Sequence, residues 1–182
     1  MLTKLIPFSA KEMSYSDLTG EFSYTSNRGK KYLYVMYDHD SNGILVTPLK
    51  NRNANTIVEA WKFLFAKLTK HGHETKMFVL DNEFSSKLKD TLKNNNLKYQ
   101  IVPPNIHRRN AAECVIQTFK NHFLSVLTTA DNEYPISEWD HLLPQAKMTL
   151  NLLRASRCNP RLSAYVYVSL LLPPPVLSKL GS

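Results

Sequence analysis

The hydrophobic pattern of this chain changes from strand-like to helix-like after about residue 50. The segments before that point are short and rich in aromatic and β-branched residues, as strands are. Asn42-Gly43 lies between two of these segments and predicts a two-residue type I′ turn, because both residues tolerate a positive φ. The second and third strands are therefore predicted to pair as an antiparallel hairpin. The three strands are expected at residues 15–22, 31–37 and 44–49.

The rest of the pattern alternates between amphipathic helices and short apolar runs. In the first helix, Ile57, Trp61 and Leu64 recur at the spacing of a single helix face. Helices are predicted at residues 54–70, 82–94, 110–127 and 137–154, and strands at residues 76–80 and 99–102. Three strands in succession, followed by two strands reached through helices, predict an α/β fold with a mixed five-stranded sheet and helices on both faces.

A single domain over residues 14–165 accounts for most of the 182 residues, a length that suits one core. Residues 1–13 are expected to be a lead-in, and residues 166–182, with LLLPPP at 170–175, a poorly ordered or degenerate tail. The apolar run at 164–172 is too short to span a bilayer. The first residues lack the apolar core of a signal peptide. We therefore expect no membrane segment and no secretion.

The chain is basic, with 23 Lys and Arg against 15 Asp and Glu and a net charge of +8. This surplus favours a polyanionic partner, either nucleic acid or an anionic membrane, although a merely soluble basic protein has the same composition. Its two cysteines, Cys114 and Cys158, have neither the spacing of a zinc site nor the number of a disulfide framework. A reducing compartment, the nucleus or the cytoplasm, is expected. Cys114 falls within an apolar helical pattern and is expected to be buried.

Three acidic residues stand where the predicted sheet would place a ligand. Asp81 directly follows the apolar run at 77–80, and Asp17 lies in the first strand, the natural neighbour of that run. Glu113 lies in the first turn of the helix at 110–127, on its polar side. Carboxylates gathered on one rim repel each other, and a divalent cation relieves that repulsion. Mg²⁺ prefers such oxygen ligands, and a pair of ions can hold both oxygens of a phosphoryl displacement.

Each acid also has a plain structural explanation. Asp17 could make a local hydrogen bond at a turn, Asp81 could cap the following helix, and Glu113 could interact favourably with a helix N-terminus. Asp38 and Asp40 flank the predicted hairpin, and a role in that turn is preferred for both. Only the combination of the three acids indicates a metal site.

Five stretches, in this order, resemble the catalytic core of retrotransposon and retroviral integrases, most closely that of long-terminal-repeat retrotransposon polyproteins. They are SDLTGEF (16–22), RGKKYLYVMYDHDSNGILVTPLKNR (28–52), FVLDNEF (78–84), VPPNIHRRNAAE (102–113) and LLPQAKMTLNLLRASRCNPRLSAY (142–165). The resemblance implies a ribonuclease H-like fold and a D,D-E site formed by Asp17, Asp81 and Glu113. It also implies Mg²⁺ or Mn²⁺ as the cofactor, with two ions in the active complex. The family usually has glycine two residues after the second Asp, where this chain has Glu83.

The resemblance also implies the chemistry and the partners. An activated water cleaves DNA near a 3′ end, and the freed 3′-hydroxyl then attacks a target strand at the same metal site. Gln117 and Lys120 match polar positions that meet the DNA end in this family. Arg108 and Arg109 are further candidates for phosphate contacts, although they could belong to a solvated basic loop. The expected partners are element-end DNA, target DNA and, in an active protein, further copies of the chain. Additional candidates for phosphate contacts, which the sequence does not rank, are Arg28, Lys30 and Lys31.

Two functions of different classes therefore stay open. The first is a metal-dependent polynucleotidyl transferase, which the acid trio favours. The second is a catalytically inactive relic that keeps the fold and binds nucleic acid or another partner. Glu83 favours the relic, as does the expectation that the zinc-binding and basic domains found beside the core in this family do not fit in this chain. A ribonuclease H-like nuclease is a more distant possibility, since it needs a fourth acid for which the sequence offers no candidate.

Overall fold

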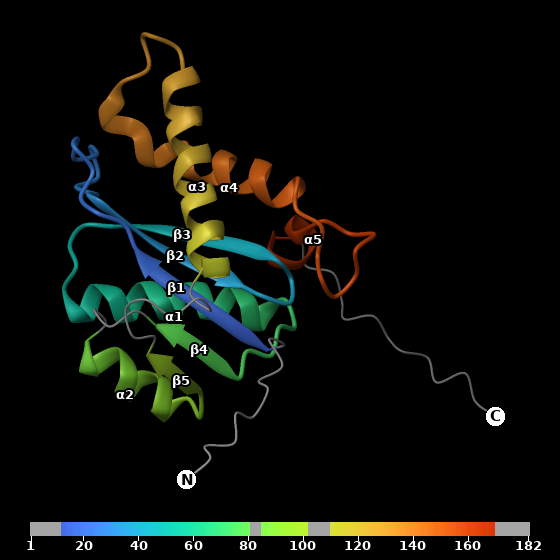
Figure 1. The fold of residues 1–182 in the computed structure, drawn as a ribbon. Helices are drawn as coiled ribbons and strands as arrows, with labels where there is room; N and C mark the ends of the chain where they lie inside the picture. Colours follow the sequence, from blue (N-terminus) through green and yellow to red (C-terminus); the bar gives the residue numbers. More distant parts are fainter. Residues whose placement is uncertain (1–11, 81–84, 102–109, 170–182) are drawn as a thin grey trace.

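The computed structural model describes residues 12–80, 85–101 and 110–169 (Figure 1). The strands are β1 (Met13–Leu18), β2 (Tyr32–Asp38), β3 (Gly43–Leu49), β4 (Met77–Leu80) and β5 (Lys98–Ile101). The helices are α1 (Ala54–Lys70), α2 (Ser86–Asn94), α3 (Asn110–Thr129), the 3₁₀-helix η2 (Ile136–His141), α4 (Leu143–Leu152) and α5 (Ala164–Ser169).

The five strands form one sheet in the order β3-β2-β1-β4-β5. β2 pairs antiparallel with both β1 and β3, whereas β1, β4 and β5 pair in parallel. The mixed sheet predicted from the sequence is confirmed. Ser16 of β1 lies opposite Leu80 of β4, so the first and fourth strands are neighbours, as expected. Because the two strands are parallel, their carboxyl ends lie at the same edge of the sheet.

Helices cover both faces of the sheet (Figure 1). α1 and α2 cover one face, where Trp61 stacks on Phe65 and meets Phe78 edge to face. α3 and α4 cover the other face, where Phe123 packs edge to face against Trp139. Burial of each large apolar side chain contributes about 1.5–3 kcal/mol, so these two layers are the main source of stability. None of the described helices has the length and apolar character needed to cross a membrane.

The hairpin between β2 and β3 forms as predicted, but the predicted two-residue type I′ turn is wrong. Asp38 pairs with Gly43, so the loop between the strands has four residues. Within it, Asn42 has a φ of 56°, whereas Gly43 is not at a positive φ. The buried Asp38 carboxylate accepts hydrogen bonds from the backbone N–H and the hydroxyl of Ser41, and these bonds define the loop. Glycine is needed at position 43 for space, because a Cβ there would overlap Cγ1 of Val168.

Several helix and strand boundaries differ from the prediction. The single helix expected at 137–154 is two helices, η2 and α4, because Pro144 lies in the first turn of α4, where a missing N–H is tolerated. The first strand ends at Leu18, and the chain then forms an irregular connection to β2. Beyond the expected end of the core, residues 166–169 belong to α5, and Val168 is buried against β3.

Candidate active site

Asp17 lies at the carboxyl end of β1, the middle strand of the sheet. Side chains alternate along this strand, so Leu18 packs on the face covered by α1 while Tyr15 packs on the face covered by α3. Asp17 shares the α3 side with Tyr15, and its side chain is 31% exposed. Its Oδ1 atom accepts a hydrogen bond of 2.8 Å from the N–H of Leu18. The local hydrogen bond considered for Asp17 therefore exists, but it uses only one carboxylate oxygen.

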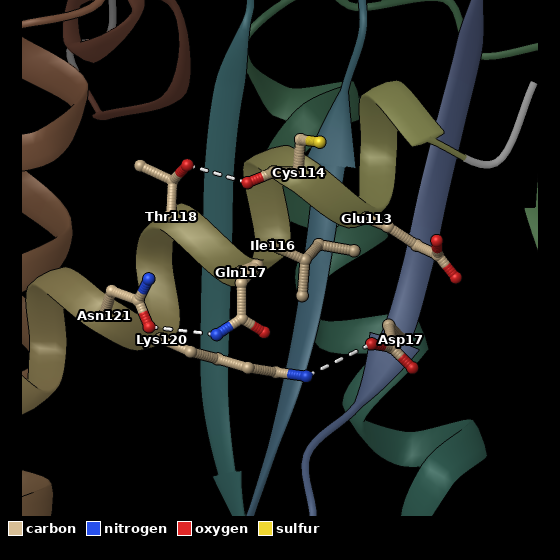
Figure 2. Close-up of a pocket in the computed structure, with 8 residues that line it drawn as sticks. All are labelled: Asp17, Glu113, Cys114, Ile116, Gln117, Thr118, Lys120 and Asn121. Carbon is tan, nitrogen blue, oxygen red and sulfur yellow. Dashed lines mark hydrogen bonds and ion pairs between the residues drawn. The ribbon is translucent and has the colours of Figure 1, made fainter.

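The amphipathic pattern of α3 places its polar residues over this strand. Ile116 and Phe119 are buried against the sheet, whereas Glu113 and Gln117 are exposed. Glu113 and Gln117 are four residues apart and therefore lie on the same side of the helix. Figure 2 shows the Glu113 side chain extending from α3 toward β1, on the side where Asp17 lies. The sequence pattern of a single helix thus determines which groups face the end of β1.

Asp17 and Glu113 line one open pocket of about 520 Å³ (Figure 2). Gln117 and Lys120, the candidates for contacts with the DNA end, line the same pocket. Four of the predicted site residues are therefore brought together. The pocket residues that the sequence analysis did not propose are Cys114, Ile116, Thr118 and Asn121.

Two of these additional residues had a signal in the sequence. Cys114 is exposed, so the expected buried thiol is wrong. Cys114 precedes the buried Ile116 by two residues, which places it about 200° away around the helix, on the exposed side. Asn121 is four residues after Gln117, and its Oδ1 accepts a hydrogen bond of 2.9 Å from Nε2 of Gln117.

Among the described residues that line the pocket, Lys120 carries the positive charge. Its Nζ atom lies 3.4 Å from Oδ2 of Asp17, and the two side chains are 28% and 31% exposed. An ion pair with this exposure contributes at most about 1 kcal/mol to stability. The pair is weak enough to be exchanged for other partners, such as a cation at Asp17 and a phosphate at Lys120.

The remaining predicted site residues, Asp81, Arg108 and Arg109, lie outside the described residues, as does Glu83. Within residues 12–80, 85–101 and 110–169, no three His, Cys, Asp or Glu side chains gather as a metal site would require. Asp17 and Glu113 nevertheless provide two carboxylates at an open pocket. Oxygen donors with access to water are the environment that Mg²⁺ prefers. The donor chemistry of the described residues therefore fits a divalent cation.

Comparison with known proteins identifies structural relatives. No protein-family model matches the sequence, and no curated protein matches it. A chain in the intasome of simian T-cell lymphotropic virus, solved in complex with PP2A regulatory subunit B56 gamma, matches with a TM-score of 0.66 and 17% identity, over 93% of this chain and 59% of that chain. The HTLV-2 integrase catalytic core domain, solved with magnesium in a trimeric form, matches with a TM-score of 0.61 and 18% identity, over 86% and 95%. The catalytic core domain of BIV integrase matches with a TM-score of 0.61 and 13% identity, over 86% and 93%.

These matches show that the protein has the fold of retroviral integrase catalytic cores. The predicted ribonuclease H-like integrase-core fold is thus confirmed. The chain spans nearly the full length of the HTLV-2 and BIV core domains but only 59% of the viral intasome chain. At identities of 13–18%, the matches show a shared fold. The activity is therefore argued from the residues of the site.

Proposed function

We propose that the protein carries out DNA integration, as the divalent-metal-dependent catalytic core of a long-terminal-repeat retrotransposon integrase. One observation carries the proposal: Asp17 on β1 and Glu113 on α3 line the same open pocket. The third acid, Asp81, directly follows β4 in the sequence, and β4 is the parallel neighbour of β1. Under this proposal the partners are element-end DNA, target DNA and further copies of the chain, in the nucleus or the cytoplasm.

Asp17, Asp81 and Glu113 would hold the cofactor, either Mg²⁺ or Mn²⁺, with two ions in the active complex. The chemistry that the cofactor supplies when bound is activation of an attacking oxygen and stabilisation of charge at phosphorus. Two displacements follow. In the first, the oxygen of water forms a bond to phosphorus, and the 3′-oxygen leaves and takes up a proton. In the second, that 3′-hydroxyl attacks a phosphorus of the target strand and displaces the target's own 3′-oxygen.

Lys120 and Gln117 would position the DNA end in this reaction. The Lys120 ammonium neutralises Asp17 at 3.4 Å, a role that a cation at Asp17 would take over. Lys120 would then be available to contact a phosphate, and such contacts make binding strongly dependent on salt. Gln117, on the same side of α3 as Glu113, would donate to the DNA backbone. Arg108 and Arg109 complete the proposed set of DNA contacts.

The second candidate function is that of a catalytically inactive relic that binds nucleic acid or another partner. The observation that favours it is the pair formed by Lys120 and Asp17. An ammonium beside an active-site acid compensates its charge without any metal, so the fold does not need a cofactor at that position.

A DNA joining and cleavage assay separates these two candidates. Labelled duplex DNA and a branched substrate would be incubated with the protein and Mg²⁺ or Mn²⁺, comparing the wild type with Asp81→Asn and Glu113→Gln. Asp90→Asn, at an exposed position of α2, is the matched control because it also removes one carboxylate. We expect activity in the wild type and the control and a loss of at least about 100-fold in the site variants. A folded, DNA-binding wild type without activity on either substrate would instead support the relic.

A further inference from the structure

The basic residues between β1 and β2 differ in their partners. Arg28 is held by a buried acid, with its Nε atom 2.7 Å from Oδ2 of Asp140. Lys31 is paired on the surface, with its Nζ atom 3.1 Å from Oε1 of Glu21. Within the part of the chain that the structure describes, the Lys30 side chain has no salt bridge. The structure therefore ranks three residues that the sequence left equal, and it singles out Lys30.

Lys30 lines a pocket together with a second lysine. Lys30 and Lys50 both line an open pocket of about 300 Å³ between the end of β3 and α1, here called the Lys30–Lys50 notch. Gly29, next to Lys30, has a φ of 73°, and a Cβ at this position would be in ordinary contact with Cε of Lys50, at 4.0 Å. Glu59 is the acid at the margin of the notch, and its Oε1 atom lies 3.9 Å from Nζ of Lys62.

The rest of the notch suits a phosphodiester. Asn51 accepts hydrogen bonds at Oδ1 from Thr56 Oγ1, at 2.8 Å, and from the N–H of Asn53, at 3.0 Å. Because Oδ1 is used in this way, the side-chain N–H groups of Asn51 are directed away from these donors. Phe63, which is 51% exposed, adds an apolar wall against which a sugar can pack.

Electrostatics favours an anion at this place. Burial lowers the pKa of the Lys30 ammonium, the positive charges of Lys50 and Arg28 lower it further, and the carboxylate of Asp140 offsets part of this shift. A negative charge bound in the notch would offset this repulsion at Lys30. The nearby acids have other partners, because Asp140 binds Arg28 and Glu59 lies 3.9 Å from Lys62, and the first turn of α1 carries no acid.

The notch lies at the same edge of the sheet as the candidate active site, but it opens beside α1, whereas Asp17 is on the face covered by α3. β1 and β3 are both antiparallel to β2, so their carboxyl ends point the same way. Asp17 of β1 pairs with Val35 of β2, and Val35 pairs with Val46 of β3. Leu49 lies three residues beyond Val46 along β3. Strand spacing and rise then put the Cα atoms of Asp17 and Leu49 about 14 Å apart. Phosphates of one DNA strand repeat about every 3.4 Å along the helix axis, so this distance corresponds to roughly four nucleotides.

We propose that the Lys30–Lys50 notch binds a backbone phosphate of the DNA substrate, about four nucleotides from the phosphate that reacts at Asp17. This inference rests on the proposed function and extends it to a surface outside the D,D-E site. The notch fixes the path of the duplex across the sheet edge, and it reads no base sequence, because phosphate contacts position DNA without specifying it.

Binding measured over a range of salt concentrations tests the notch. Fluorescence anisotropy with a labelled duplex would compare the wild type, Lys30→Gln/Lys50→Gln, and the control Lys70→Gln/Lys93→Gln, which removes two exposed lysines near the C-terminal ends of α1 and α2. We expect the slope of log affinity against log salt to fall by about 1–2 in the notch variant. The slope of the control should equal that of the wild type, and Lys30→Arg/Lys50→Arg should restore it.

Duplexes that carry one neutral methylphosphonate linkage then locate the contact. The wild type should lose affinity at a linkage roughly four nucleotides from the joining point, and the notch variant should show no further loss there. A steep wild-type slope that is unchanged in the notch variant would overturn the notch and leave the proposed function standing. A wild type that binds no duplex would overturn both.

Discussion

Asp17 lies on β1 and Asp38 lies on the neighbouring strand β2. The Asp17 carboxylate is partly exposed, whereas the Asp38 carboxylate is buried. Asp38 is 2% exposed and accepts hydrogen bonds from the Ser14 hydroxyl, at 3.1 Å, and from both the N–H and the hydroxyl of Ser41. His73 Nδ1 lies 3.6 Å from the same carboxylate. Asp17 is partly exposed, bonds locally to Leu18, and has Lys120 at 3.4 Å.

This difference shows how a structural acid is distinguished from one that can bind a ligand. The protein surrounds Asp38 with its own donors, which confirms the role in the turn that was predicted for it. Asp17 lines an open pocket with a second carboxylate, that of Glu113. Buried polar groups need partners from the protein, whereas a group left at a pocket can take its partners from a metal or a substrate.

Replacement of Asp38 should cause the largest change in stability. Asp38→Ala leaves the hydroxyl of Ser14 and the N–H of Ser41 without their acceptor in a buried site, which costs about 3 kcal/mol. The free energy of unfolding, measured with urea, should fall by that amount. Asp38→Asn should recover part of it, because one acceptor oxygen remains. A loss below about 0.5 kcal/mol would show that Asp38 is as dispensable to the fold as a surface acid.

Gly43→Ala tests the packing behind the same hairpin. The added methyl group would overlap Cγ1 of Val168 and lie 2.9 Å from Ser41 Oγ, and such overpacking costs about 1–3 kcal/mol. The double variant with Val168→Ala should recover part of the loss. Gly20→Ala is the control, since a Cβ at position 20 would have nothing within 4 Å. Equal thermal stability of the Gly43 and Gly20 variants would contradict the close contact with α5.

Replacement of Asp17 should have little effect on folding. Asp17→Asn removes an exposed ion pair with Lys120, so the free energy of unfolding should change by less than about 1 kcal/mol. Urea unfolding of this variant beside Asp38→Asn compares the two acids directly. A larger loss for Asp17→Asn than for Asp38→Asn would reverse the assignment of the structural and the ligand-binding acid.

Lys120→Gln should produce the smallest effect, a tighter binding of divalent cations. It removes the ammonium that competes for Asp17 Oδ2, so Mn²⁺ affinity should rise by a few-fold, the equivalent of about 1 kcal/mol. Lys98→Gln, at an exposed position of β5, is the control for the loss of charge. Weaker Mn²⁺ binding in Lys120→Gln than in that control would mean that Lys120 supports the metal site instead of competing for it.

The sequence predicted the parts of this molecule that depend on local pattern. The order of strands and helices along the chain, the pairing of β2 with β3 and the polar side of α3 follow from local pattern, and Asp17 and Glu113 line one pocket. It did not predict features that depend on residues far away in the chain. Gly43 packs against Val168, a residue far away in the sequence, so its presence beside Asn42 was not the sign of a two-residue turn.

The basic residues show the same limit. Arg28, Lys30 and Lys31 are almost adjacent in the sequence, and nothing local distinguishes them. Their difference comes from Asp140, which is brought from η2 to Arg28, and from Lys50, which is brought from the end of β3 to Lys30. Charge partners of this kind are set by the tertiary fold, so composition could indicate a nucleic-acid partner but not the surface that meets it.

The most direct test of the account is a Mn²⁺ titration followed by calorimetry, with wild type, Asp17→Asn, Glu113→Gln and Asp38→Asn compared at equal folded concentration. If Asp17 and Glu113 share one metal site, both of their variants should lose Mn²⁺ affinity by at least about tenfold, or about 1.4 kcal/mol. Asp38→Asn should bind as the wild type does once its stability is taken into account. Unchanged binding in Asp17→Asn and Glu113→Gln would contradict a shared metal site at this pocket.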